Sequence, residues 1–346
     1  MTDQTEQNVP AIEPIEPKET HVARQWKHSA PMLGCRYDPT CKLVFGTSMD
    51  MSVQRWDLEK DSHAQFTGGH ESWVRSVGFS LDGTKMFTSG YDGRLCFWNA
   101  HEEIAEGESA KPVKQVDAHD GWIRWLAVSP DGKTIATAGN DHLVKLWSSD
   151  SGELLQTLQK HEAHIYSLYF LPDGSQLLSG DLKGQVHQWE TSTGKYVRTL
   201  DAKPLHTYHG GQQVDYGGVR CMSLNASGNQ LACGGLHKAT NPFAGVQEPL
   251  VVVFDWESGK QIRTHEAKEI PRGIVWRLIH ESDGTLVSGI GGQEGYVVFW
   301  NEEKLDFHKI KLPSPILDLD RHAIRPEAAV ACYDGHLRIV RMAKKA

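Results

Sequence analysis

One short phrase is repeated along this chain at intervals of about forty residues. A turn-forming stretch with a polar residue is followed, six positions later, by an aromatic or apolar residue that ends an alternating run. Asp141 and Trp147 in "NDHLVKLW" form one copy. The end residues are separated by 42, 49, 42, 65, 46 and 40 positions, and they are Trp56, Trp98, Trp147, Trp189, Phe254, Trp300 and Val340. Units of this length cannot bury an apolar face alone, so the period predicts one repetitive domain of stacked units.

Each unit reads as four short β-strands. Turns such as "SLDGT", "SPDGK" and "LPDGS" separate the first two strands, and turns such as "DSGE" and "STGK" follow the end residue. Glycine in such turns permits the left-handed backbone that tight hairpins need, and the chain of 346 residues has 33 glycines. The sequence therefore predicts an all-β fold of four-stranded antiparallel sheets.

The repeat resembles that of the WD-repeat family of β-propellers, whose G-beta-type units begin at Gly-His and end at Trp-Asp. Gly69–His70 and Trp56–Asp57 match these two marks, and the resemblance runs from about residue 22 to about residue 341. It implies a seven-bladed β-propeller of four-stranded antiparallel blades. The last unit offers only three strands, so we expect an N-terminal strand at 21–26 to complete it. Closing the ring in this way removes both sheet edges.

Both chain ends differ in composition from the repeats. Residues 1–20 carry five acidic residues and three prolines and are predicted to be a disordered acidic tail. Residues 21–341 are predicted to be the propeller, and 342–346 a basic C-terminal tail.

The resemblance also implies a buried hydrogen-bonded network in each well-formed blade. In the family, a His at the blade start, a Ser or Thr, the turn Asp and the Trp indole take part. The matching sets are His70, Thr88, Asp92 and Trp98 in one blade, and His119, Thr137, Asp141 and Trp147 in the next. These sets could be mistaken for catalytic triads. Because they recur with the blades, we interpret them as structural.

Two groups of residues are predicted to bind a partner on the top face, where both insertions of the fifth unit should emerge. The insertions span 201–218 and 234–249, and they contribute His206, Tyr208, His209, Tyr216 and Phe243. The starts of the first strands, around the central opening, contribute Trp73, Arg75, Trp122, Arg124, His164, Tyr166, Arg220 and Trp276. Trp, Tyr and Arg are enriched at interface hot spots. Packing between blades is the alternative role for these rim residues.

Several function classes receive no support from the sequence. The net charge of −8 argues against general nucleic-acid binding, and no apolar run is long enough to span a membrane. Six cysteines without a CxxC pair suit reduced thiols in a cytoplasmic protein. His206 and His209 with Asp215 do not match HExxH, and neither GxxxxGK[ST] nor GxSxG is found. We therefore expect no metal, no cofactor and no enzymatic activity.

The sequence thus predicts a non-enzymatic scaffold or recognition module, monomeric by itself, that binds another protein or peptide through the top face. One alternative is a small charged ligand or a modified peptide in the central opening, where the arginines favour an anion. A propeller hydrolase or lyase is a less favoured alternative, because no ring of acidic residues marks the starts of the first strands.

Overall fold

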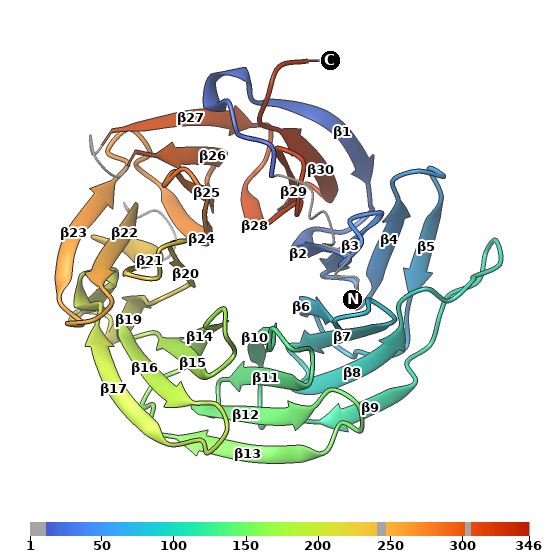
Figure 1. Cartoon of the computed structure of the whole chain (residues 1–346), viewed down its shortest axis with the longest axis horizontal. Coiled ribbons are helices and arrows are strands. Elements are labelled where there is room, and N and C mark those ends of the chain that lie inside the picture. The colour runs from blue at the N-terminus through green and yellow to red at the C-terminus, as the bar shows by residue number, and fades with distance from the viewer. Residues whose placement is uncertain (1–11, 241–246, 302–305, 346) are drawn as a thin grey trace, which may run out of the picture.

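The chain forms a closed ring of seven β-sheets around a central axis (Figure 1). The computed structural model describes residues 12–240, 247–301 and 306–345. Within these residues there are seven four-stranded antiparallel sheets and one additional two-stranded hairpin. The predicted all-β, seven-bladed architecture is therefore confirmed.

The first strand of each blade lies nearest the axis and the fourth lies outermost (Figure 1). The strands of blades one to four are β2 (Met32–Tyr37), β3 (Leu43–Ser48), β4 (Val53–Asp57), β5 (His63–Phe66), β6 (Val74–Phe79), β7 (Lys85–Gly90), β8 (Arg94–Asn99), β9 (Lys114–Asp117), β10 (Ile123–Val128), β11 (Thr134–Gly139), β12 (Leu143–Ser148), β13 (Leu154–Gln159), β14 (Ile165–Phe170), β15 (Gln176–Asp181), β16 (Gln185–Glu190) and β17 (Tyr196–Asp201). Those of blades five to seven are β20 (Cys221–Leu224), β21 (Gln230–His237), β22 (Glu248–Asp255), β23 (Gln261–Glu266), β24 (Gly273–His280), β25 (Leu286–Gly292), β26 (Gly295–Trp300), β27 (Phe307–Leu312), β28 (Ile316–Arg321), β29 (Glu327–Cys332), β30 (His336–Arg341) and β1 (His21–Lys27). Every predicted end residue lies on the third strand of its blade.

The N-terminal strand closes the ring, as the sequence predicts. β1 pairs antiparallel with β30, from His21 opposite Arg341 to Lys27 opposite His336. Blade seven therefore combines strands from both ends of the chain (Figure 1). Without β1, the third strand β30 would be the outer edge of blade seven.

The apolar core is divided among the interfaces between blades. Seven clusters of buried residues fill the seven interfaces, one for each neighbouring pair of blades. Phe87 and Phe97 of blade two, for example, pack with Ile123 and Trp147 of blade three. Each blade is thus stabilised mainly by its two neighbours, which makes the closed ring a condition for complete burial.

Blade three contains the predicted hydrogen-bonded network. Burial lowers the pKa of His119, so its ring is neutral, and Nδ1–H donates to both oxygens of Asp141 at 2.9 Å. The Thr137 hydroxyl lies 2.7 Å from His119 Nε2 and accepts from Trp147 Nε1 at 2.8 Å. Because the hydroxyl accepts from the indole, its own proton is available to the imidazole. Every polar side-chain atom of this network therefore has a hydrogen-bond partner.

Blades two and four contain the same network. His70, Thr88, Asp92 and Trp98 are connected in blade two by contacts of 2.8–3.2 Å. In blade four, the position six residues before Trp189 is Lys183, yet the network is complete. Asp181 at the end of β15 supplies the carboxylate, 2.8 Å from His161 Nδ1. His161 and Trp189 both contact the Ser179 hydroxyl.

The substitution Asp141→Ala is expected to lower the free energy of unfolding by about 1–3 kcal/mol, because the buried His119 ring loses its acceptor. Denaturant or thermal unfolding measures the change. Asp120→Ala is a matched control, because the Asp120 side chain is exposed in the same blade, and its effect should stay within about 0.5 kcal/mol. An Asp141→Ala protein that unfolds like the wild type would contradict a stabilising role for the network.

The described parts of the two predicted tails pack on the propeller. Residues 12–20 were expected to be disordered, but Ile15 is buried among residues of blades six and seven. The Glu16 amide donates to the Met342 carbonyl, and a short 3-10 helix, η1 (Pro17–Glu19), leads into β1. Met342 is also buried, so the predicted C-terminal tail begins inside the core. These segments cover the interface beside the closure.

Candidate interaction surface at the mouth of the channel

The connections between blades and the turns between second and third strands lie together on one face, which we call the top face. Backbone hydrogen bonds tie the two sets of loops together; the amides of Tyr91, Asn140 and Leu182 donate to the carbonyls of Trp73, Trp122 and His164, respectively. Residues of both loop types therefore surround the opening of the central channel on this face.

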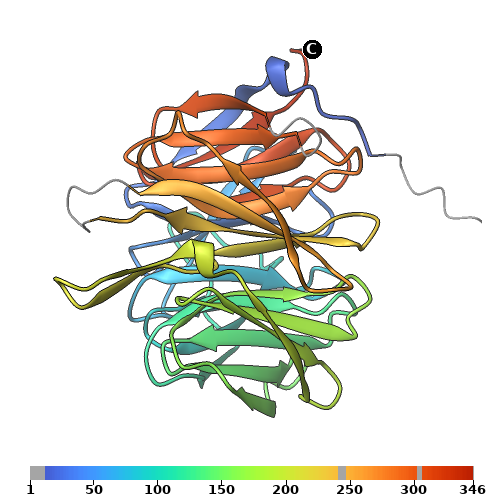
Figure 2. The same cartoon turned by 90° about the vertical axis from the view of Figure 1, so that its left-hand side faces the viewer.

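The first insertion of blade five forms a hairpin of β18 (His206–His209) and β19 (Val214–Gly217), preceded by η2 (Lys203–Leu205). The hairpin projects beyond the ring (Figure 2). Its base is fixed because Leu205 is buried with residues of β21 and β22. His206 Nε2 lies 2.7 Å from Asp215, whereas Tyr208 is 58% exposed. Phe243, the predicted contribution of the second insertion, lies outside the described residues.

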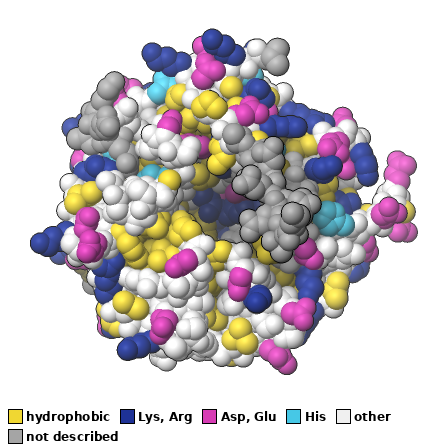
Figure 3. Space-filling view, viewed as in Figure 1, with side chains coloured by type: hydrophobic (Ala, Val, Ile, Leu, Met, Phe, Trp, Pro, Cys, Tyr) yellow, Lys and Arg dark blue, Asp and Glu magenta, His cyan; other side chains and the backbone are white. Residues whose placement is uncertain are grey.

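One residue at the same position of each first strand faces the channel. In six blades this residue lies at a β-bulge, where an extra residue is left out of the strand pairing. Arg220, directly before β20, is the equivalent residue of blade five by sequence. We call these seven residues the channel ring: Leu33, Arg75, Arg124, Tyr166, Arg220, Trp276 and Leu317. Lys and Arg side chains lie in the hollow at the centre of the space-filling view (Figure 3).

Cation–π contacts connect the arginines of the channel ring with its aromatic members. The Arg220 guanidinium carbon lies 3.6 Å from the ring centroid of Tyr166 and 5.5 Å from that of Trp276. Arg124 lies 4.6 Å from Tyr166, and Arg75 lies 5.7 Å from Trp276. Sequence-distant residues of five blades are thus connected by one continuous series of cation–π contacts.

Exposed and partly exposed aromatic side chains of blades two, three and seven lie beside the ring on the top face. Tyr91 stacks on Trp122 with centroids 4.4 Å apart and planes at 2°, and Trp73 lies 5.7 Å from Tyr91. Trp73 and Trp122 are 43% and 44% exposed, and Tyr333 is 54% exposed. We call Trp73, Tyr91, Trp122 and Tyr333 the mouth patch. A cavity of about 180 Å³ joins this patch to the ring, and it is lined by Leu33, Met49, Trp73, Arg75, Tyr91, Trp276, Leu317 and Tyr333.

Most of the predicted rim residues therefore meet at one place. Arg75, Arg124, Tyr166, Arg220 and Trp276 belong to the channel ring. Trp73 and Trp122 belong to the mouth patch. His164 lies beside them, where its Nδ1 contacts the Asn140 carbonyl at 3.0 Å. The residues of the hairpin, His206, Tyr208, His209 and Tyr216, form a separate projection above blade five.

Sequence reasoning missed two members of the mouth patch, Tyr91 and Tyr333. Both directly precede the turn aspartate of their blade, at Asp92 and Asp334. Comparing the repeats at that position would have identified them. Antiparallel pairing of the first and second strands places this turn beside the start of the first strand.

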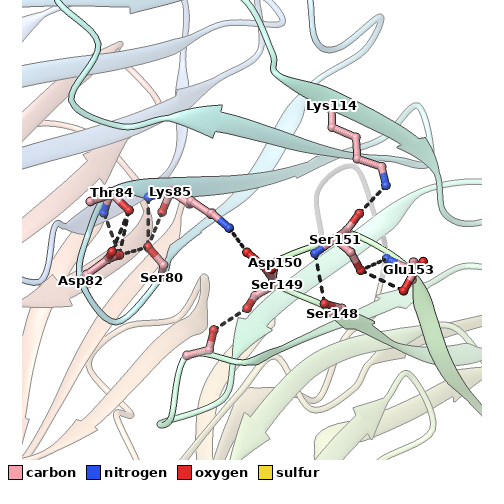
Figure 4. Close-up of polar contacts among 11 residues, drawn as sticks. Ser80, Asp82, Thr84, Lys85, Lys114, Ser148, Ser149, Asp150, Ser151 and Glu153 are labelled. Carbon is pink, nitrogen blue, oxygen red and sulfur yellow. Dashed lines mark hydrogen bonds and ion pairs between the residues drawn. The ribbon is translucent and has the colours of Figure 1, made fainter.

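A second hollow, of about 490 Å³, lies at the outer junction of blades two and three. Lys85 of β7 reaches Asp150 in the turn after β12 at 2.5 Å, and Lys114 of β9 donates to the Ser151 carbonyl (Figure 4). The ammonium groups of Lys85 and Lys114 therefore bind to the neighbouring blade. The hollow is therefore better explained as a joint between blades than as a binding site.

Among residues 12–240, 247–301 and 306–345, no three His, Cys, Asp or Glu side chains are grouped as metal ligands would be. In the same part of the chain, no helix has the length and apolar character needed to cross a bilayer.

The family model for the WD domain, G-beta repeat, matches residues 62–99, 110–148 and 152–190. Each match begins around the outermost strand of one blade and ends with the third strand of the next, as in β5 to β8. The sequence repeat is thus offset from the blade by one strand, and this offset is why β1 must complete blade seven. The three matches also contain the three complete His networks.

Curated relatives share segments of the repeat region. Periodic tryptophan protein 2 of Arabidopsis thaliana is 31% identical over 77 residues, which are 22% of this chain and 9% of that protein. Transducin beta-like protein 3 of Rattus norvegicus is 37% identical over 62 residues, 18% of this chain and 8% of that protein. DDB1- and CUL4-associated factor 10 of Xenopus laevis is 33% identical over 66 residues, 18% of this chain and 14% of that protein. The matched segments therefore span about a tenth of the relatives' length.

Repeated four-stranded blades around a channel define the protein as a β-propeller. Three of its repeats are similar to the G-beta repeat of the WD domain, and the propeller has seven blades closed by an N-terminal strand.

Proposed function

We propose that this protein is a non-enzymatic interaction module that binds a partner protein or peptide through its top face. The mouth patch carries the proposal, because it exposes two tryptophans and a tyrosine together around the channel opening. Large aromatic side chains that stay exposed next to one another mark interaction sites in soluble proteins.

The family supports the same role. WD-repeat propellers are typically scaffolds for protein interactions, and one relative is named for its association with DDB1 and CUL4. One buried carboxylate of the inner strands is poorly suited to catalysis. Asp318 is held by Arg36 at 2.7 Å and by Arg277 at 2.8 Å. A carboxylate neutralised in this way is a poor general base.

Affinity capture from cells that produce the protein tests the proposal. We expect the paired substitution Trp73→Ala/Trp122→Ala to reduce recovery of at least one partner by tenfold or more, because each hot-spot aromatic contributes about 2 kcal/mol or more. The matched control is Leu81→Ala/Val113→Ala, which removes two side chains that are 68% and 76% exposed outside the mouth patch. Unfolding curves confirm that both variants are folded. Equal loss of partners from both variants, or from neither, would contradict top-face binding.

A further inference from the structure

The channel ring concentrates positive charge that the described residues do not neutralise. It contains Arg75, Arg124 and Arg220 and no acidic residue. In the described part of the chain, none of these three guanidinium groups forms an ion pair with a carboxylate. The two arginines deeper in the channel differ, since Arg36 and Arg277 share the carboxylate of Asp318. The uncompensated charge is therefore confined to the ring, directly below the mouth patch.

The hydrogen-bonding groups of the ring are also largely unused. Arg220 Nε is buried and has no hydrogen-bond partner among the described residues. Arg75 donates through Nη1 to the Leu33 carbonyl at 2.6 Å, and Arg124 donates through Nε to Asn140 at 2.6 Å. Each guanidinium has five N–H donors, so most of them have no protein partner among the described residues.

Holding these arginines together without an anion is unfavourable. Burial lowers the pKa of Arg220; the nearby Tyr166 partly opposes that effect, and the positive charge of Arg124 adds to it. Stacking on Tyr166 and Trp276 offsets part of the desolvation, but it supplies no negative charge. An anion between the guanidinium groups would relieve the repulsion and satisfy the free donors at once.

We infer that the channel ring is a socket for an anionic side chain of the partner, with the neighbouring partner residues packed on the mouth patch. This inference rests on the proposed function and adds the chemistry of the ligand. The cavity between patch and ring has an apolar side at Leu33 and Leu317 and a cationic side at Arg75. It therefore suits an extended peptide that places a carboxylate or phosphate below apolar or aromatic neighbours.

Three degenerate peptide libraries that differ only in their central residue test the inference. The central residue is glutamate, phosphoserine or glutamine, and binding is measured by fluorescence anisotropy. We expect at least one anionic library to bind tenfold or more tightly than the glutamine library, because a hydrogen bond to a charged group contributes that much. Preference for phosphoserine over glutamate would identify phosphate as the source of the anion, and equal binding would identify simple negative charge.

The variant Arg220→Met separates a binding role from a structural one. It should weaken anionic-peptide binding by tenfold or more while leaving the melting temperature unchanged or higher, because a buried unpaired charge is removed. Arg198→Met is the matched control: Arg198 stacks on Trp256 at 4.7 Å near the outer edge, and the change in net charge is the same. Its peptide binding should match that of the wild type.

Three results would count against the inference. One is equal binding of the anionic and glutamine libraries that is lost in Trp73→Ala/Trp122→Ala, which would leave top-face binding intact. Another is failure of every library to bind, together with no rise in melting temperature on adding inorganic phosphate. An Arg220→Met protein that is less stable but binds anionic peptides normally would also assign Arg220 to structure alone.

Discussion

A chain that begins at residue 28, and so lacks β1, is expected to lose the cooperative unfolding transition of the full protein. Six residue pairs join β1 to β30, and Trp26 of β1 stacks on Trp56 of blade one with centroids 5.7 Å apart. At about 1 kcal/mol for each backbone hydrogen bond, the loss is roughly 5 kcal/mol or more, close to the whole stability of an ordinary domain. Circular dichroism melts and light scattering measure it, since an exposed β30 edge also favours aggregation.

Supplying the missing strand separately gives this experiment its control. A synthetic peptide of residues 12–27 should restore the transition, because it provides both β1 and the buried Ile15. A scrambled peptide of the same composition should not. If the truncated chain alone melts like the full protein, ring closure by β1 is not needed for stability.

The blade pattern could be predicted because each blade repeats the same local requirements. The third-strand residue must fill an interface between blades, and tight turns need glycine, so both recur in the sequence. In blade four the repeat position does not predict the network residue, but the hydrogen-bonding requirement of His161 does. His161 needs a carboxylate near Nδ1, and Asp181 satisfies it from a different position than the repeat predicts. The prediction of disorder for residues 12–20 does not hold for a different reason. Composition does not reveal a distant partner, such as the residues of blades six and seven that bury Ile15.

The sequence predicts those residues of the candidate site that recur at one position of the first strand of each blade. The channel-ring arginines follow from the register of the first strands, which is visible in segments such as "WVRSV" and "WIRWL". The pairing of Asp318 with Arg36 could not be read from sequence, because 282 positions separate them. They meet only because closure places β28 beside β2.

The second large effect is expected at that closure, where Asp318→Asn should lower the free energy of unfolding by about 3–5 kcal/mol. The Asp318 side chain is 4% exposed and accepts from Arg36 Nη1 at 2.7 Å and from Arg277 Nε and Nη2 at 2.8 and 3.2 Å. Asparagine keeps the volume of the side chain but removes its charge, which takes away the carboxylate partner of Arg277 and leaves Arg36 with Asp320 alone, at 3.9 Å. Chemical denaturation of the two proteins measures the difference.

Asp61→Asn provides the comparison for the same chemical change at an exposed ion pair. Asp61 is 72% exposed and lies 2.5 Å from Arg24, so its loss should cost less than about 1 kcal/mol. Similar effects at the two positions would show that burial does not control the energy of the Asp318 pairs.

Asp318→Asn should also change the binding of anionic peptides at the channel ring, in the opposite direction to its effect on stability. By adding uncompensated positive charge below Arg75, it should strengthen binding of anionic peptides while the fold becomes less stable. Loss of both stability and anion affinity would mean that Asp318 positions the ring arginines rather than balancing their charge.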